Sequence, residues 1–329
     1  MSFKYFALAA SLCAIALPTL AQDRPVLDIY TYDSFAAEWG PGPALKAGFE
    51  VSCGCTVRFV TAEDAISMLR KLQLEGSSSP ADLVVGLDTA TMGEARATGL
   101  FAAHGLTPEG LVLDWQDAEF IPFDHGYFAF VYDKRRTIAP PSSFEELIAR
   151  PDSFKIVIED PRSSTPGLGN VFWIAAAYGD RASEIWHGLK PHVLTVTRGW
   201  SEAYGLFLDG QADMVLSYTT SPAYHAVAES DDNYAYAPFA EGFVSQVEVA
   251  GLVAGGDQPE LGRAFLGYLT SPEAQRIIPT TNWMYPVIDI GADLPAAFGM
   301  PPAKVLVVDE ETIAANSRAW VDAALAALQ

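Results

Sequence analysis

Short apolar runs alternate with longer amphipathic segments along most of the chain. The runs, rich in Val, Ile and Leu, lie at residues 26–30, 56–60, 82–87, 155–160, 192–196 and 213–217. Between and after them, the spacing of apolar residues predicts helices over 62–74, 168–178, 201–208 and 259–269. Strand and helix in alternation are typical of parallel sheets covered by helices on both faces. The pattern therefore predicts the α/β class.

Two segments of the chain resemble each other. "GSSSPADLVVGLD" (76–88) and "DGQADMVLSYT" (209–219) both place Ala-Asp and then an apolar run after a helical segment that ends in glycine. Asp before a buried strand is common, so chance is one explanation; two similar halves are the other. A chain of this length also exceeds one ordinary hydrophobic core. Since ligands of open α/β sheets bind beyond the carboxyl ends of the strands, two facing sheets would form one cleft.

The N-terminus has the pattern of a secretory signal peptide over residues 1–21. Lys4 precedes the apolar stretch 5–17, and small residues surround the expected cleavage site at Ala21. The stretch is too short for a membrane helix. Cys13 could suggest a lipid anchor, but Leu12 stands where that signal has a small residue. We expect a secreted protein without a membrane anchor.

The chain has 20 basic and 41 acidic residues, and its formal net charge is −21. Such a surface repels nucleic acid and attracts cations, although solubility alone is a sufficient explanation. No nucleic-acid partner is expected.

Catalytic and metal-binding motifs are not found in the sequence. It contains no phosphate-binding G-x-x-x-x-G-K-[ST], no H-E-x-x-H and no G-x-S-x-G. Cys53 and Cys55 could form a disulfide in an oxidising compartment, and they would need further ligands to hold a metal. His125 and His225 are interpreted as structural or rim residues. No catalytic residue and no metal site are predicted.

Aromatic and hydroxyl residues recur just beyond the predicted strand ends. Several have an ordinary structural explanation: Asp64 fits a capping box that starts at Thr61, Ser164 and Thr165 precede a helix, and Ser201 resembles a helix cap. The alternative is an aromatic cage, because two or three ring faces can hold a flat cation at about 0.5–2 kcal/mol each. The residues concerned are Tyr32, Asp64, Ser164, Thr165, Trp200, Tyr218, Thr219, Thr220, Ser221, Tyr224 and Trp283.

Six longer segments carry a resemblance to a known family. They are "YTYDSFAAEWGPGP" (30–43), "FDHGYFAFVYDK" (123–134), "DPRSSTPGLG" (160–169), "GWSEAYGLFL" (199–208), "LSYTTSPAYH" (216–225) and "NWMYPV" (282–287). In this order they resemble the periplasmic thiamine-binding proteins of bacterial ABC importers, over nearly the whole mature chain. The resemblance implies a type II periplasmic binding protein, a two-lobed Venus-flytrap fold in which each lobe is a mostly parallel sheet flanked by helices, with a hinge between. We expect residues 22–124 and 246–288 in lobe 1, and 125–245 and 289–329 in lobe 2.

The same resemblance implies a function. A monomeric periplasmic receptor would bind thiamine, and its mono- and diphosphate, in the cleft and deliver it to an inner-membrane ABC permease with its ATPase. Neither a cofactor nor an enzymatic activity is implied. The family's ligand contacts fall on Asp64, Ala65, Ser164, Thr165, Trp200, Tyr218, Thr219, Thr220 and Ser221, and Tyr32, Tyr224 and Trp283 match aromatic positions expected to line the site. Ala65 stands where a relative has glycine.

This resemblance suggests a role for each group of residues. Trp200, Tyr218 and Trp283 would pack on the thiamine rings, Asp64 would meet the positive or amino end, and Ser164 with Thr165 would meet the tail. Two alternatives stay open. A ferric-ion receptor of the same fold could use Tyr218, Tyr224 and His225, and a thiamine-cleaving transferase would need a nucleophile such as a free cysteine.

Overall fold

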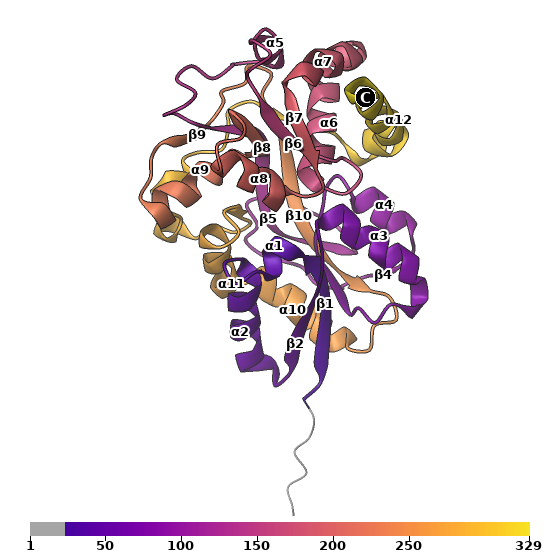
Figure 1. The fold of residues 1–329 in the computed structure, drawn as a ribbon. Coiled ribbons are helices and arrows are strands. Elements are labelled where there is room, and N and C mark those ends of the chain that lie inside the picture. The colour runs from indigo at the N-terminus through magenta and orange to yellow at the C-terminus, as the bar shows by residue number, and fades with distance from the viewer. Residues whose placement is uncertain (1–23) are drawn as a thin grey trace, which may run out of the picture.

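The computed structural model describes residues 24–329. The predicted signal peptide and Cys13 lie outside the described residues. Over the described part of the chain the main strands follow the order β2-β1-β3-β10-β5-β8-β6-β7. Figure 1 shows two groups of strands and helices, one above the other, joined by long strands that run through both.

The first group contains three parallel strands, β1 (Val26–Tyr32), β2 (Thr56–Ala62) and β3 (Leu83–Asp88). Alternate residues of β1 enter two different cores. Leu27 and Ile29 pack with α2 (Pro41–Cys53) and α10 (Pro259–Leu269), whereas Tyr30 packs with α3 (Ala65–Glu75) and α4 (Met92–Ala97). Helices therefore cover both faces of this sheet, as a parallel sheet requires. The short helices α1 (Asp33–Ala36) and α11 (Pro272–Ile277) complete the group.

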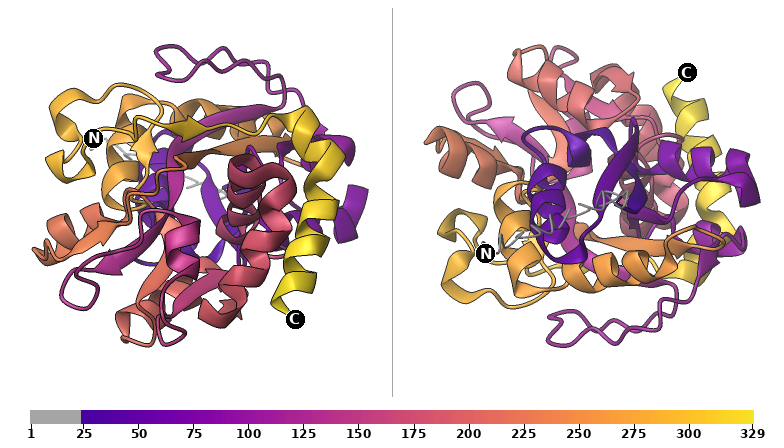
Figure 2. Two further views of the ribbon diagram at one scale, coloured as in Figure 1. Left: turned by 90° about the horizontal axis from the view of Figure 1, so that it is seen from above. Right: turned by 90° about the horizontal axis from the view of Figure 1, so that it is seen from below.

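The second group repeats this design with β6 (Ile156–Glu159), β7 (Val193–Thr197) and β8 (Met214–Tyr218). Its helices are α5 (Phe144–Ile148), α6 (Thr165–Tyr178), α7 (Ala182–Leu189), α8 (Trp200–Leu208) and α9 (Ser221–Tyr224). The C-terminal helix α12 (Glu310–Leu328) contacts α6, α7 and α4. Figure 2 shows α12 running along the outside of the molecule.

Two long antiparallel strands join the groups. In β5 (Phe120–Asp133), residues 120–127 pair with β10 (Phe243–Val253), and residues 128–132 pair with β8. Short strands add to the edges: β4 (Phe101–Ala102), β9 (Tyr234–Tyr236), β11 (Tyr285–Pro286) and β12 (Val305–Leu306). The architecture confirms the predicted two-lobed α/β class, but the sequence pattern did not identify β5 and β10 as strands.

The similarity between the two halves has a structural basis. Asp82 lies before β3 and accepts a hydrogen bond from the backbone N–H of Asp28 in β1 at 2.8 Å. Asp213 lies before β8 and accepts one from the backbone N–H of Lys155, before β6, at 2.7 Å. In each half the Asp ties the start of one parallel strand to its neighbour.

Three predicted helix starts are wrong. α3 begins at Ala65 rather than at residue 62, and Thr61 lies in β2, so the Thr61 capping box does not form. α6 begins at Thr165 rather than at 168, with Ser164 as its N-cap. α8 begins at Trp200 after Gly199, so Ser201 is inside the helix and is not its cap. Two residues separate each of α3 and α8 from the strand before it, whereas five residues separate α6 from β6.

Cys53 and Cys55 form a disulfide at the end of α2. Gly54 between them has a positive φ of 62°, which glycine adopts without steric cost. The open question of a bridge is thus answered in favour of one.

Over residues 24–329, no helix combines the length and the apolar character that a membrane span needs.

Candidate functional site

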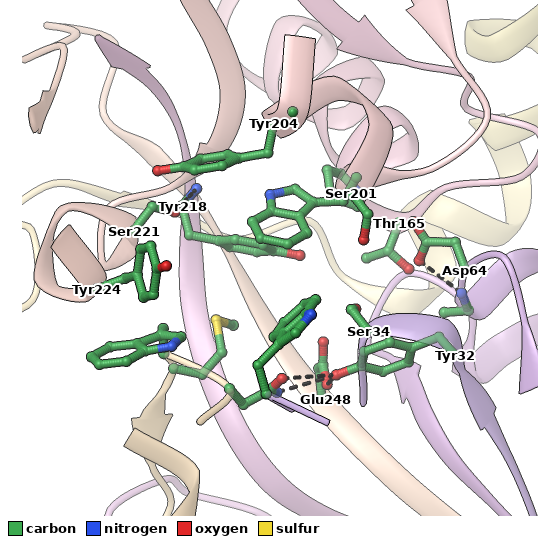
Figure 3. Close-up of a pocket in the computed structure, with 18 of the residues that line it drawn as sticks. Tyr32, Ser34, Asp64, Thr165, Ser201, Tyr204, Tyr218, Ser221, Tyr224 and Glu248 are labelled. Carbon is green, nitrogen blue, oxygen red and sulfur yellow. Dashed lines mark hydrogen bonds between the residues drawn. The ribbon is translucent and has the colours of Figure 1, made fainter. Parts of the chain in front are cut away.

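A cavity of about 500 Å³ lies between the two groups of strands. It is bordered by residues that follow the carboxyl ends of β1, β2, β6, β7 and β8, where ligands of α/β sheets bind. Figure 3 shows side chains from both groups pointing into it.

Aromatic and acidic side chains dominate the cavity wall. The described residues that line it include no Lys, Arg or His. Its aromatic members are Tyr32, Trp39, Trp200, Tyr204, Tyr218, Tyr224 and Trp283, and its acidic members are Glu63, Asp64 and Glu248.

The structure brings nine of the twelve predicted site residues to this cavity: Tyr32, Asp64, Ala65, Thr165, Trp200, Tyr218, Ser221, Tyr224 and Trp283. Ser164, Thr219 and Thr220 do not line it. Ser164 lies behind Asp64 and donates a hydrogen bond to it, while the backbone N–H of Thr219 donates to the carbonyl of Tyr127. The hydroxyl of Thr220 faces the sulfur of Met284.

Trp200 forms one aromatic wall of the cavity. Its ring stacks on Tyr204, with centroids 4.9 Å apart, and its indole N–H donates to the Ser217 hydroxyl at 2.8 Å. Ser217 in turn shares a hydrogen bond with Ser221. These contacts fix the orientation of the indole, so its ring face is already in position to contact a ligand before binding.

Tyr224 and Trp283 meet at another part of the wall. Their rings make an edge-to-face contact at 5.3 Å, and Trp283 stacks on Phe298. Trp283 has a φ of 57°, in the left-handed region that a bulky side chain rarely adopts. Such strain is maintained only by surrounding contacts and is concentrated at functional sites.

Asp64 lies where helix starts from both groups converge. Its carboxylate accepts the backbone N–H of Ala65 and the hydroxyl of Ser164, both at 2.7 Å. The backbone N–H groups of Thr165 and Trp200, the first residues of α6 and α8, also act to lower the pKa of this carboxyl. Burial raises the pKa of Asp64 above its usual range, and these hydrogen bonds act in the opposite direction.

Glu248 on β10 and Glu63 after β2 are the acidic lining residues that the sequence interpretation missed, and Glu248 is the buried one. It accepts a hydrogen bond from the Tyr32 hydroxyl at 2.8 Å and one from the Gln246 amide at 3.2 Å. Asn282, also in the wall, donates to Asp124 at 2.6 Å and to the Tyr32 hydroxyl at 3.1 Å. The available signal was a Gln and a Glu inside the otherwise apolar run 243–253.

Tyr218 lies between the two acidic regions at the end of β8, with its ring against Phe128. Burial, together with the negative charges of Glu248 and Asp64, raises the pKa of its hydroxyl well above the usual value. The hydroxyl therefore stays protonated and the cavity keeps an electron-rich ring without adding a further charge.

The two histidines are structural, as predicted. His225 is fully buried, with one ring nitrogen against the Tyr204 hydroxyl at 2.9 Å and the other against Glu229 at 2.6 Å. His125 is buried against the ring of Tyr285. Neither lines the cavity. Among residues 24–329 no group of three or more His, Cys, Asp and Glu side chains is arranged to hold a metal.

Comparison with known proteins places the chain in a family. Residues 38–276 match the family model described as bacterial extracellular solute-binding protein. The chain is 49% identical over 310 residues to the thiamine-binding periplasmic protein of Salmonella typhimurium, covering 93% of this chain and 94% of the relative.

Solved structures agree. A periplasmic thiamin binding protein has a TM-score of 0.90 and 48% sequence identity, with 93% of this chain and 97% of the other covered. A ferric binding protein from Campylobacter jejuni has a TM-score of 0.75 at 19% identity, over 92% of this chain and 99% of the other, and this likeness shows the fold alone. The chain therefore belongs to the bacterial extracellular solute-binding protein family.

Proposed function

We propose that this protein is a periplasmic receptor that binds thiamine in the cavity between its lobes and delivers it to an ABC importer of the inner membrane. The names of its relatives support the ligand and the compartment. Thiamine mono- and diphosphate are proposed as further ligands. The relatives are solute-binding transport proteins rather than enzymes.

The observation that carries this proposal is the composition of the cavity wall. Seven aromatic and three acidic residues line it, and no basic residue does so over the described chain. Thiamine has a positively charged thiazolium ring and a flat aminopyrimidine ring. Ring faces stabilise such a cation by about 0.5–2 kcal/mol each when water is excluded.

The rings would lie between Trp200, Tyr218 and the Tyr224–Trp283 pair. The hydroxyethyl tail, or a phosphate on it, would lie toward the starts of α6 and α8, where backbone N–H groups favour oxygen ligands. Asp64 already accepts donors from those helix starts. We therefore propose that Asp64 lies toward the tail end of the cavity, and the contact of this carboxylate with the positive or amino end of the ligand stays a prediction.

Closure of the lobes would enclose the ligand. We propose that residues 22–124 with 246–288, and 125–245 with 289–329, move as the two bodies. β5 and β10 are the strands that connect the two sheets, and bending within such extended strands disturbs few core contacts. The permease would recognise the closed form of the monomer.

The two alternatives have less support. The proposed iron ligand His225 has both ring nitrogens engaged by Tyr204 and Glu229, so it is not free to join Tyr218 and Tyr224 at a metal. A thiamine-cleaving enzyme needs a nucleophile at the ligand, but Cys53 and Cys55 are bridged and do not line the cavity.

Titration calorimetry with thiamine and its mono- and diphosphate tests the proposal. Trp200→Ala and Tyr218→Ala should each weaken thiamine binding by about 2 kcal/mol or more, because each removes a ring face from the wall. Thr61→Ala is the control, since Thr61 is exposed on β2 near Asp64 and does not line the cavity.

The fold of each variant is checked by circular dichroism. A folded wild-type protein that gives no binding heat with any of the three ligands would reject the proposal. Unchanged affinity in both aromatic variants would remove the two residues from the site.

A further inference from the structure

Five carboxyl groups around the cavity are buried without a basic partner. They are Asp64, Asp88, Asp124, Glu159 and Glu248, none more than 8% exposed. No ion pair joins any of them to a Lys, Arg or His of the described chain. Two other buried acids do have such partners, since Asp28 pairs with Arg58 and Asp133 with Arg135. Buried Asp82 accepts two backbone N–H groups instead. Burying a carboxylate without a counter-charge costs free energy. The five groups are therefore either protonated or neutralised when a cation binds.

Glu248 is one of the two members of this set that line the cavity. Only the Tyr32 hydroxyl and the Gln246 amide donate to it. Asp64 also lines the cavity, but the backbone N–H of Ala65 and the hydroxyl of Ser164 donate to its carboxylate. The helix starts at Thr165 and Trp200 also act to lower its pKa, against the effect of burial. Glu248 is therefore the acid with the most capacity to meet a positive charge.

Asp124 lies directly opposite Glu248 on the neighbouring strand β5. It is fully buried, and one of its carboxylate oxygens has no hydrogen-bond partner. Asn282 and Tyr32 connect the two acids, because Asn282 donates to Asp124 and to the Tyr32 hydroxyl, which donates to Glu248. Two like charges in such a network cannot both form cheaply.

The titratable groups that act on Glu248 are all acidic or phenolic. They are Asp124 from β5, Tyr32 from β1, Asp88 from β3 and Asp64 from the start of α3. Tyr218 from β8 is coupled to it by charge, and Glu63 lines the same cavity near its rim. Burial, and then the charge of Asp124, raises the pKa of Glu248 well above its usual value, and burial raises the pKa of Asp124 to about 7.

We propose that Glu248, with Asp124 behind it, determines the preference of the cavity for cationic ligands. Glu248 holds a proton when the cavity is empty, because Asp124 across the sheet opposes a second negative charge, and an organic cation beside Glu248 takes the place of that proton. On binding, the carboxyl O–H bond breaks, the proton passes to solvent, and the electron pair stays on the carboxylate that faces the cation. This inference rests on the proposed function for the identity of the cation.

The exchange of a proton for a cation predicts measurable effects that a purely structural role of Glu248 would not produce. Cation affinity should rise with pH around neutrality, because less work is then needed to remove the proton. Binding should release protons, and neutral ligands of the same shape should show neither effect. Glu248→Gln and Asp124→Asn should change affinity in opposite directions, since the first removes the charge that meets the cation and the second removes the charge that retains the proton.

The experiment is calorimetry of thiamine binding at neutral pH in buffers with different ionisation heats, which yields the number of protons released. Glu248→Gln should weaken thiamine binding at least about 30-fold and abolish most of the release. Asp124→Asn should bind thiamine as tightly as wild type or more tightly, with less release. Thiochrome, a neutral oxidation product of thiamine, should bind wild type and Glu248→Gln with similar affinity.

Glu145→Gln is the matched control, because it makes the same chemical change in an exposed residue that pairs with Arg181 and does not line the cavity. It should leave affinity and proton release close to wild type. Thiamine binding to wild type without proton release, or equal affinity of wild type and Glu248→Gln, would overturn this inference and leave the receptor function standing. Loss of binding in both Glu248→Gln and Asp124→Asn would also overturn it. Absence of thiamine binding by folded wild type would instead reject the proposed function.

Discussion

Two carboxylates in one cavity, Asp64 and Glu248, have opposite surroundings. Asp64 is bound by a hydroxyl and by backbone N–H groups, and the starts of α3, α6 and α8 all point toward it. Glu248 has one phenol and one amide as donors and a second acid, Asp124, across the sheet. Figure 3 shows the two groups apart from each other, with Asp64 at the right of the site and Glu248 at the lower centre beside Tyr32.

The difference shows that surroundings, more than residue type, determine what a buried acid does. Donors from two lobes make Asp64 a structural tie between them. Glu248 lacks such donors, so its negative charge must be neutralised by a proton or by a bound ligand.

The poorly satisfied acids should make the stability of the ligand-free protein depend strongly on pH. The pKa values of Asp88 and Asp124 are raised by burial to about 7, and burial also raises that of Glu159. A carboxyl with a raised folded-state pKa contributes stability below its unfolded pKa, and that contribution is lost as pH rises through the folded value. Between about pH 5 and about pH 8 the free energy of unfolding should fall by several kcal/mol.

Urea unfolding at a series of pH values measures this effect. Saturating thiamine should flatten the profile, because a bound cation replaces the protons near Glu248. A free energy of unfolding that stays constant across this interval would show that the buried acids are ionised in the empty cavity, because they would then bind no proton in either the folded or the unfolded state.

Asp64→Ala should destabilise the protein by about 2 kcal/mol, because it leaves backbone N–H groups at helix starts without an acceptor. Ser164→Ala, which removes one donor to that carboxylate, should cost about 1 kcal/mol. Equilibrium unfolding in urea at one pH gives both values. If the two variants were equally stable, the convergence of helix starts on Asp64 would not be its main contribution.

Tyr32→Phe should have a smaller effect, which acts on thiamine binding through Glu248. It removes the hydroxyl that donates to Glu248 and receives from Asn282, with little change in ring volume. We expect a loss of about 1 kcal/mol in thiamine affinity, since a donor to the ionised carboxylate is lost. Calorimetry measures it, with Tyr224→Phe as the control, because that hydroxyl contacts Glu229 on the outside. An equal loss in the control would argue against a specific role for the Tyr32 donor.

The sequence predicted the fold well where the pattern is local. All six predicted strands are present within one or two residues of their predicted ends, and α10 spans 259–269 as expected. β5 was not found because Pro122, Asp124 and Gly126 interrupt its apolar pattern. These three positions are buried because β5 is a central strand that passes beside the cavity. Their burial depends on the whole sheet and not on neighbouring residues in the sequence.

The residues that line the cavity were predicted less completely than the strands. Aromatic residues after strand ends were identified because parallel strands bring their carboxyl ends to one place. Glu248 lies inside a strand and enters the cavity only because β10 crosses between β3 and β5. Asp64 was identified, but the helix start was misplaced, since the conformation of the Thr61–Asp64 segment depends on donors from α6 and α8, a hundred or more residues away.

The smallest effect concerns a second link between the lobes, the ion pair of Arg198 with Glu63 at 3.2 Å. Unlike the Asp64–Ser164 contact, this pair is exposed, with Arg198 80% and Glu63 49% accessible. Water and salt screen such a pair, and holding two long side chains in place costs entropy. Arg198→Ala should therefore change the free energy of unfolding by no more than about 0.5 kcal/mol, and high salt should remove even that difference. Urea unfolding at low and high ionic strength measures it. A loss as large as that of Ser164→Ala would mean that the rim pair, and not the buried carboxylate, connects the lobes.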